Sequence, residues 1–306
     1  MNFLLAFLLC VQSSEAPPAL VDSITADGVF AHISELASDG YQGREAGTPG
    51  ADKAAEYIVA KLKEWKLAPA GTRGMYFQPF AIEGKTTRNI LAVLPGTHAS
   101  LKNEYVLIGA HYDHIGESRG GSDTINNGAD DNASGTAAVL EIARAFAALK
   151  ERPARSIVFA WWSAEEKGLV GSKFFVDNPT LNLRAVVACL NLDMVGRNAE
   201  DSIDIEGTGC SPDLKATFER VNARKIFAKI NYEVAEVKKD TDHYWFYESG
   251  IPAVEFFSGY HADYHKPGDE SQKITKPKLE KVGRFVALSA WDLAGGKKRP
   301  AYKKVK

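Results

Sequence analysis

From residue 88 onward, strongly apolar runs alternate with stretches of helical periodicity, and this alternation constrains the fold more than any other feature of the chain. The runs are RNILAVL, EYVLIGAH, ARSIVFAWW and RAVVACLNLD, and helical stretches at 134–149 and 169–176 separate the last three. Near-continuous apolar strands separated by helices indicate a largely parallel sheet that is covered on both faces. We therefore expect the α/β class, as a three-layer α/β/α sandwich around a mostly parallel, mixed central sheet.

The rest of the chain adds elements of the same kinds without dividing it. Apolar periodicity predicts further helices at 28–38, 49–67, 212–224 and 277–295, and further strands at 202–207 and 251–257. A glycine-rich segment, SDGYQGREAGTPG, predicts a loop between the first two helices. Because no repeat and no Pro-, Gly- or Ser-rich linker interrupts the pattern, we expect residues 17–306 to form a single domain.

The first 16 residues, MNFLLAFLLCVQSSEA, combine a short apolar run with small and polar residues that end at Ala16. This pattern predicts a signal peptide at 1–16, and the apolar run is too short to cross a bilayer as a helix. A buried helix is the less favoured alternative. No later apolar run is long enough to span a membrane. We expect a secreted or periplasmic protein with no stable membrane insertion once the signal peptide is removed.

Composition limits the partners of the chain. The formal net charge is -2, with 45% hydrophobic and 25% charged residues, which is typical of a globular protein with a sizeable core. A charge this small creates no field that would favour nucleic acid or an anionic membrane. Cys189 lies in the apolar run AVVACL, where a buried free thiol is expected.

Imidazole and carboxylate side chains follow the predicted strands at the places where ligands bind in open α/β sheets. They are His111 and Asp113 after the second run, Asp131 before the helix at 134–149, Glu165 and Glu166 after the third run, Asp193 after the fourth, and His265 past the strand at 251–257. One such residue usually caps a helix or is solvated. Their convergence is unfavourable without a cation, because like charges repel and burial penalises them.

The donor set predicts two transition-metal ions. Two imidazoles and three carboxylates suit zinc, whereas calcium and magnesium sites are dominated by oxygen. Five ligands are too many for one tetrahedral catalytic zinc, but they suit two ions that share a carboxylate and a water. One of the adjacent glutamates would bind metal and the other would act as general base. Asp113 would accept the second N–H of His111. Cobalt and manganese remain alternatives to zinc.

Six stretches in this order resemble a known family: GAHYDHIG, GADDNASG, WWSAEEKGLVGS, LNLDMVG, GIPAVEF and DYHKPGDE. They are similar to the zinc aminopeptidases of metallopeptidase family twenty-eight, and the resemblance covers roughly residues 30–290. It implies a zinc-exopeptidase-like fold. It also implies that peptides with a free N-terminus are the substrates and that two Zn²⁺ ions are the cofactors.

The resemblance assigns a role to each site residue. His111 and Asp193 resemble the ligands of one zinc ion, Glu166 and His265 those of the other, and Asp131 the bridging ligand. The bond from Asp131 to Asn132 resembles a cis peptide of the family. Two catalytic roles follow in the same way, Glu165 as general base and Tyr264 as a hydrogen-bond donor to the oxyanion, with plain packing as the alternative for Tyr264.

Four residues near the predicted ligands are expected to have supporting or structural roles. His114 and His261 are expected at the surface or behind the ligands, and Arg197 as an ion-pair partner rather than a contact of substrate carboxylate. Met194 is expected in the core, with lining of the substrate pocket as the alternative. The insertion at 117–127, ESRGGSDTINN, is either a flap over the site or a mobile loop.

These observations predict a metal-dependent hydrolase that removes N-terminal residues from peptides by means of a zinc-activated bridging water and the base Glu165. Two other functions are compatible with the fold. A glutaminyl-peptide cyclotransferase would hold a single zinc and leave His111 without metal. A receptor-like module without catalysis is the third reading, and the intact ligand set and Glu165 disfavour it.

Overall fold

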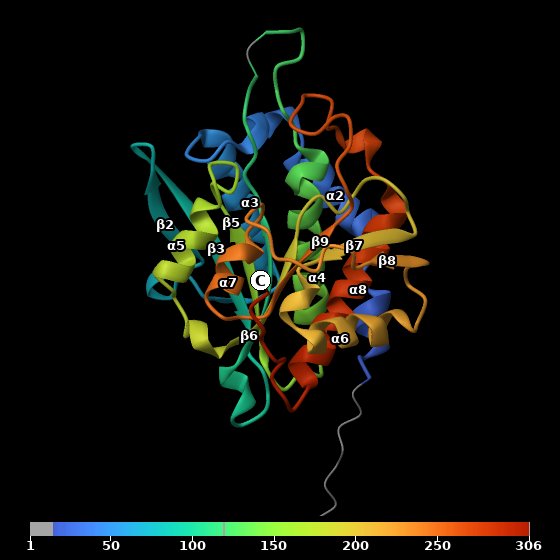
Figure 1. The fold of residues 1–306 in the computed structure, drawn as a ribbon. Coiled ribbons are helices and arrows are strands. Elements are labelled where there is room, and N and C mark those ends of the chain that lie inside the picture. The colour runs from blue at the N-terminus through green and yellow to red at the C-terminus, as the bar shows by residue number, and fades with distance from the viewer. Residues whose placement is uncertain (1–14, 119, 306) are drawn as a thin grey trace, which may run out of the picture.

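The computed structural model describes residues 15–118 and 120–305, and the predicted signal peptide lies outside them except for its last two residues. In the described residues, a nine-stranded sheet forms the centre of the fold (Figure 1). Its strands are β1 (Ala68–Pro69), β2 (Phe77–Ile82), β3 (Lys85–Leu94), β4 (Tyr105–His111), β5 (Ser156–Trp162), β6 (Val186–Leu192), β7 (Ser202–Glu206), β8 (Lys229–Asn231) and β9 (Ala253–Phe257).

The sheet is mixed, with a parallel centre and antiparallel margins. The strand order is β1-β3-β5-β4-β6-β9-β7-β8, and β2 pairs with β3 outside this path. The four central strands, β5, β4, β6 and β9, run parallel, whereas β3 and β7 join them antiparallel. The carboxyl ends of the parallel strands therefore meet at one edge of the sheet, where ligands bind in open α/β sheets.

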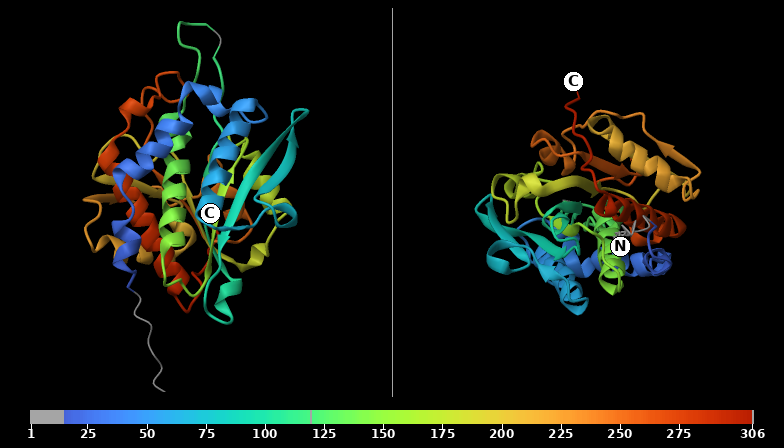
Figure 2. Two further views of the ribbon diagram at one scale, coloured as in Figure 1. Left: turned by 180° about the vertical axis from the view of Figure 1, so that it is seen from behind. Right: turned by 90° about the horizontal axis from the view of Figure 1, so that it is seen from below.

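Helices cover both faces of the sheet. They are α1 (Pro18–Asp22), α2 (Ala26–Leu36), α3 (Pro49–Glu64), α4 (Gly135–Ala148), α5 (Val170–Asp177), α6 (Pro212–Asn222), α7 (His243–Glu248) and α8 (Lys276–Gly295). On one face, α3, α4 and α8 contact the sheet, α2 packs on α4 and α8, and α6 packs on α8 (Figure 2). On the other face, α5 and α7 contact β3, β6 and β9. This arrangement confirms the predicted three-layer α/β/α sandwich.

The sequence pattern explains the packing of these layers. All seven residues of β5 and of β6 are buried, as expected for strands that are covered on both faces. In α3, which begins with Pro49 after Thr48, Ala54, Ile58 and Leu62 recur at four-residue spacing and are buried against the core, and Trp65 just after the helix is half-buried. The main core lies between the sheet and the α4 and α8 layer.

The cysteines of the described residues form no disulfide. Cys189 and Cys210 are both free and buried, so the expected free thiol at Cys189 is confirmed. Among the helices of the described residues, none is long and apolar enough to span a bilayer.

In the insertion, Glu117 pairs with Ile125 in a short antiparallel bridge, and the loop projects away from the body of the molecule (Figure 1). None of its described residues lines the pocket at the carboxyl edge.

Candidate metal centre

The predicted site residues come from separate elements that meet at the carboxyl edge of the sheet. His111 is the last residue of β4, and Asp193 follows β6 directly. The two glutamates lie in the turn after β5, and Asp131 lies in an irregular helical turn, Ala129–Ser134, that precedes α4. His265 lies in the loop between β9 and α8. The parallel order of β5, β4, β6 and β9 therefore brings the five predicted ligands together.

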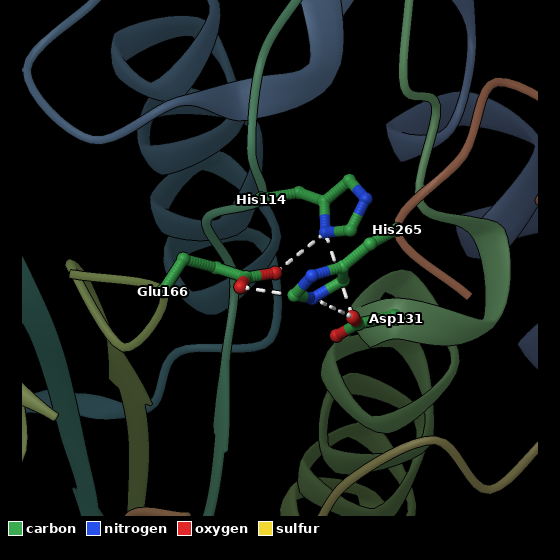
Figure 3. A group of neighbouring side chains, drawn as sticks. All are labelled: His114, Asp131, Glu166 and His265. Atoms are coloured by element: carbon green, nitrogen blue, oxygen red, sulfur yellow. Dashed lines mark hydrogen bonds and ion pairs between the residues drawn. The ribbon is translucent and has the colours of Figure 1, made fainter. Parts of the chain in front are cut away.

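One group of donors surrounds His265 (Figure 3). Its Nε2 atom lies 3.1 Å from Oδ2 of Asp131 and 3.1 Å from Oε2 of Glu166. Nδ1 of His114 lies 2.7 Å from the other oxygen of Glu166, Oε1. The four side chains come from four separate segments and point toward one another, with donor atoms within 4.8 Å of each other. Such a group has the composition of a zinc site.

A second group of donors surrounds His111. Its Nε2 atom lies 3.3 Å from Oδ1 of Asp193 and 3.4 Å from Oδ1 of Asp131. All three side chains are buried. Asp131 thus belongs to both groups, with Oδ1 toward His111 and Oδ2 toward His265. Two donor groups joined by one carboxylate are the arrangement that a pair of ions with a bridging ligand requires.

The chemistry of this donor set fits the predicted zinc pair. Two buried carboxylates, the half-buried Glu166 and two imidazoles converge in a small volume, which is unfavourable unless cations compensate the negative charge. The peptide bond from Asp131 to Asn132 is cis, as the family resemblance implied. Met194 and His265 adopt left-handed backbone conformations, with φ of 47° and 55°, beside or at a ligand position. Strained residues of this kind are common at functional sites.

The adjacent glutamates lie in different surroundings. Glu166 belongs to the His265 group, whereas Glu165 belongs to neither group and lies with Oε2 3.9 Å from Nε2 of His111. Burial raises the pKa of Glu165 well above its ordinary value. Burial acts on Glu166 in the same sense, but hydrogen bonds from His114 and His265 outweigh it and lower the pKa of Glu166. The two carboxyl groups are therefore electrostatically distinct.

The imidazoles respond to the same carboxylates. Burial disfavours the charged form of His111, but the charges of Asp193 and Glu165 outweigh it and raise the pKa of His111 well above the ordinary value. His265 follows the same pattern, and its bonds to Asp131 and Glu166 raise its pKa to about 10. The carboxylates therefore favour the positively charged form of both rings, which indicates that the negative charge of the site needs a positive partner.

Asp113 and Tyr264, which the sequence also predicted at the site, each contact a predicted ligand. Nδ1 of His111 lies 3.2 Å from the backbone oxygen of Asp113 and 3.8 Å from its carboxylate, which accepts a hydrogen bond from the amide of Glu165. Asp113 therefore holds both the first ligand and the turn that carries the glutamates. The ring of Tyr264 stacks on His265 with centroids 3.9 Å apart, and it lines the pocket.

His114 and His261 are less exposed than a surface position would require. His114 is fully buried and hydrogen-bonded to Glu166, so of its two expected positions the structure shows the one behind a ligand. His261 has a side chain that is 4% exposed, with Nε2 3.3 Å from Oδ2 of Asp130. Arg197 pairs with Asp263 at 3.0 Å, as expected of an ion-pair partner.

Other supporting residues were not predicted. Thr241 donates a hydrogen bond of 2.7 Å to Oδ2 of Asp193, the oxygen that does not face His111. Oδ2 of Asp269 accepts hydrogen bonds from the amides of Asp130 and Asp131 and so holds the bridging ligand in place. Asp269 lies in the DYHKPGDE stretch, which was a usable signal. Thr241 lies in a loop whose sequence offers no such signal.

Arg44 connects the N-terminal loop to the site loops. Its buried guanidinium donates hydrogen bonds to the backbone oxygens of Leu36, Tyr112, Asn127 and Gly128, at 2.7 to 3.0 Å. The last three acceptors flank the segments that carry His111 and Asp131. The segment that contains it, η1 (Asp39–Arg44), lies in the loop that the glycine-rich sequence predicted. One side chain thus fixes two site loops at once.

A pocket opens from the metal centre. Its volume is about 110 Å³. Site residues form one part of its lining, and the remainder comes from β7, β9 and nearby loops, namely Met194, Glu206, Lys238, Asp240, Glu255, Phe257 and Tyr260. Met194, although buried, lines the pocket together with Phe257, so the alternative expected for Met194 is the one that the structure shows. A small pocket beside the metal centre suits a single residue of a substrate.

Comparison with known proteins places these observations in a family. Residues 89–290 match the model of Peptidase family M28. The leupeptin-inactivating enzyme 1 of Streptomyces exfoliatus is 31% identical over 269 residues, which cover 86% of this chain and 55% of that enzyme. The chain spans about half the length of the curated relatives that it matches.

Solved structures share the fold. A zinc aminopeptidase from Bacillus subtilis matches with a TM-score of 0.73 at 19% identity, over 91% of this chain and 98% of that one. A glutaminyl cyclase from Porphyromonas gingivalis matches with a TM-score of 0.74 at 22% identity, over 87% and 98%. The family match covers the strands β4 to β9 and all five predicted ligands, and this chain belongs to Peptidase family M28.

Proposed function

We propose that this chain is a metal-dependent aminopeptidase that removes residues from peptides with a free N-terminus. One observation carries the proposal. Asp131 belongs to two donor groups at once, while Glu165 lies outside both and faces the same pocket. This arrangement supplies two ion sites and a separate carboxylate for proton transfer, which is what hydrolysis by a metal pair requires.

In the proposed site, Glu166 and His265 would hold one zinc ion, His111 and Asp193 would hold the other, and Asp131 would serve as a ligand of both. Bound zinc supplies Lewis acidity, which polarises a carbonyl and lowers the pKa of water. His114 and Thr241 orient Glu166 and Asp193 through their hydrogen bonds. Cobalt and manganese prefer similar donors, so the identity of the ions is part of the proposal.

The chain's own residues would carry the proton and the charge. Glu165 takes the proton of the attacking water and returns it to the leaving amine. The raised pKa of Glu165 makes its carboxylate a stronger base toward the attacking water, and the carboxylic acid formed in that step then donates the proton to the leaving amine. The phenol of Tyr264, beside His265, is placed to donate a hydrogen bond to the developing oxyanion.

Glutaminyl cyclisation is the alternative with the same fold. A cyclase with one zinc would leave His111 without metal, whereas here His111, Asp131 and Asp193 form a complete second donor group. The likeness to the glutaminyl cyclase is one of fold, at 22% identity. A receptor-like module without catalysis has no need of Glu165 in its buried position. The aminopeptidase is therefore the function that the geometry supports best.

We further propose that residues 1–16 direct export, so that the mature chain is secreted or periplasmic. The apolar run and the small residues before Ala16 support this. Fractionation of expressing cells, with N-terminal sequencing of the mature protein, tests the proposal. A chain that is found in the cytoplasm with its N-terminus intact would contradict it.

The decisive experiment for the function compares a peptide with its N-acetyl form. The acetyl cap removes the charge and the lone pair of the α-amine, and a site built for a polar partner penalises its absence. We expect the free peptide to lose its first residue and the capped peptide to lose nearly all kcat/KM, as followed by mass spectrometry. Comparable cleavage of both peptides, or cuts away from the first bond, would contradict an exopeptidase.

A metal arm completes this experiment. Incubation with a chelator should abolish cleavage, and added zinc should restore it, with two zinc ions per chain in the active protein by elemental analysis. Cleavage that is indifferent to the chelator would contradict the metal-dependent mechanism. A single ion per active chain, together with cyclisation of an N-terminal glutamine peptide, would favour the cyclase.

A further inference from the structure

A second acidic group lies beside the metal centre. It consists of Glu206, Asp240 and Glu255, which line the same pocket, and of His243, which is buried next to them and does not line it, and we call these four residues the acidic subsite. Donor atoms of Asp240, His243 and Glu255 lie within 4.8 Å of one another, and Glu206 lines the same pocket. None of the four residues belongs to either donor group around Asp131.

The register of β9 places Glu255 below the metal centre. Side chains alternate along a strand, so Phe256 packs in the core while Glu255 and Phe257 face the pocket. Glu255 pairs with Asn191 of β6, two residues before Asp193. At about 3.3 Å per residue, the backbone position of Glu255 lies roughly 7 Å further along the strand from the metal centre than that of Phe257.

The carboxylates of the acidic subsite lack sufficient positive partners. Glu255 lies directly opposite Glu206 across the antiparallel pair of β9 and β7, an arrangement that is unfavourable for like charges. Glu255 is 6% exposed, and in the described part of the chain no ion pair reaches it. Burial raises the pKa of Glu255 well above its ordinary value. A cation beside it would offset this cost.

His243 supplies an independent sign of a missing partner. The ring is 1% exposed, and within the described residues neither ring nitrogen has a hydrogen-bond partner. Burial lowers the pKa of His243 to about 3, so the ring is neutral and one nitrogen is a free acceptor. A buried acceptor among carboxylates, without a donor, is a position that an N–H donor would satisfy.

The pocket already accepts one flexible ammonium group. Nζ of Lys238 lies 3.5 Å from Oε2 of Glu206, and the lysine side chain is half exposed. Such a pair contributes little free energy and is easily exchanged. One ammonium group faces three carboxylates, so negative charge remains that a second cation would compensate. Met194, Phe257 and Tyr260 also line the pocket, and the methylenes of a long cationic side chain would pack on these side chains.

We propose that the acidic subsite binds the ammonium or guanidinium group of a lysine or arginine at the N-terminal position of the substrate. The inference rests on the aminopeptidase function proposed above and names its substrate class. The scissile bond lies at the metal centre, the stem packs on Met194 and Phe257, and the cation meets Glu255, Asp240 and Glu206. The enzyme therefore prefers a basic first residue to an apolar one.

The test compares peptides that differ only in their first residue: lysine, arginine, leucine or norleucine. Norleucine has the four-carbon stem of lysine without the ammonium group, so the ratio of kcat/KM for the lysine and norleucine peptides isolates the charge. We expect a ratio of about ten or more in the wild-type protein, since hydrogen bonds to charged groups are the stronger ones. Mass spectrometry of the released residue gives both values.

Three variants sharpen the result. Glu255→Gln keeps the shape and should lower the ratio about tenfold, and Lys238→Met removes the competing ammonium and should raise it. Glu64→Gln alters a carboxylate on α3 that pairs with Lys61 at the surface, and it should leave the ratio at the wild-type value. An unchanged ratio in both subsite variants would overturn the proposal.

The remaining outcomes separate the two proposals. Cleavage of free N-termini with leucine or norleucine preferred to lysine would overturn this inference alone. Absence of cleavage for every peptide, with two zinc ions bound, would overturn the aminopeptidase function and this inference with it. A third zinc ion per chain that is lost in Glu255→Gln would show that the acidic subsite is a metal site, and would overturn the proposal.

Discussion

At the scale of single residues, the most informative contrast is between Glu165 and Glu166. The chain turns sharply between β5 and α5, where Ala164 has a φ of 58°. The turn directs Glu166 into the donor group of His265 and leaves Glu165 nearer to His111. Adjacent residues of the same type therefore have separate roles, and substitutions should separate them.

We expect Glu165→Gln to retain both zinc ions and to lower turnover by about a hundredfold or more, because the amide keeps the size and loses the basicity. Glu166→Ala deletes a ligand and should lose an ion. Elemental analysis and steady-state kinetics on a free peptide measure the two effects. Glu64→Gln should match the wild-type protein in both, and equal metal loss in the two site variants would refute the assignment.

His114 offers a second prediction at this scale. Its Nδ1 atom is 2.7 Å from Glu166, and it orients this ligand without binding zinc in the proposed site. His114→Gln should keep two ions at saturating zinc while the affinity for one ion falls about 10- to 100-fold. Titration of the metal-free protein against a competing chelator measures this. His98→Gln, at an exposed position, is the control. Loss of an ion at saturation would make His114 a ligand.

At the scale of elements, η1 acts on the site through Arg44. Four backbone oxygens from three segments accept hydrogen bonds from this one buried side chain. A buried carbonyl that loses its donor costs about 1–3 kcal/mol. The contact between this N-terminal loop and the segments before α4 therefore contributes strongly to the free energy of folding and holds the site loops in position.

We expect Arg44→Met to lower the free energy of unfolding by at least about 3 kcal/mol, because several buried carbonyls lose their partner together. Urea denaturation at neutral pH measures the change. Arg152→Met, at an exposed position between α4 and β5, should change it by less than about 0.5 kcal/mol. An equal effect of the two substitutions would show that the four bonds contribute little.

The elements also show what the sequence could predict. The strands β3, β4, β5 and β6 were predicted because continuous apolar runs indicate double burial. The edge strand β2 was missed, since Pro79 interrupts it and its pairing depends on the length of β3. The helix α7 was missed too, because HYWFYE is short and carries no clear apolar stripe. Tertiary context decides such segments.

The same reasoning applies to the site. The five predicted ligands follow strand ends, so topology alone brings them near one another. Thr241 and Asp269 come from loops whose paths no periodicity encodes. Glu255 lies inside the apolar run IPAVEFF, where its direction depends on which face of β9 meets the pocket. That face is known only when the neighbouring strands are placed.

At the scale of the whole molecule, a buried histidine connects three helices and makes stability depend on pH. His32 of α2 lies 2.6 Å from the hydroxyl of Tyr57 on α3 and 4.0 Å from Glu141 on α4. Burial lowers the pKa of His32 from 6.5 to about 4, although Glu141 acts in the opposite sense. The folded chain therefore favours the neutral ring.

This depressed pKa has a definite sign. Above pH 6.5 the ring is neutral in both states, and its contribution to stability is complete. As the pH falls from 6.5 toward 4, the unfolded chain binds a proton that the folded chain excludes, so the free energy of unfolding decreases. Between pH 7 and pH 5, the loss from His32 should be about 2 kcal/mol, at 1.36 kcal/mol per unit.

The corresponding measurement is urea unfolding of the metal-free protein at both pH values. His32→Gln should lose about 2 kcal/mol less than the wild-type protein on acidification, since it has no ring to protonate. His98→Gln should follow the wild-type curve. Parallel curves for all three proteins would show that His32 is protonated equally in the folded and unfolded states.

The metal ligands and the acidic residues of the pocket occupy different parts of the sheet, and this has an evolutionary consequence. The ligands lie at the ends of β4, β5, β6 and β9 or in the segments that follow them, whereas Glu206 and Glu255 lie within β7 and β9. Mutations within β7 and β9 change what the pocket accepts and leave the hydrolytic machinery intact. Proteins with this scaffold can therefore diverge in the substrates that they prefer while their catalytic chemistry is conserved. A few replacements on the pocket-facing sides of two short strands are enough.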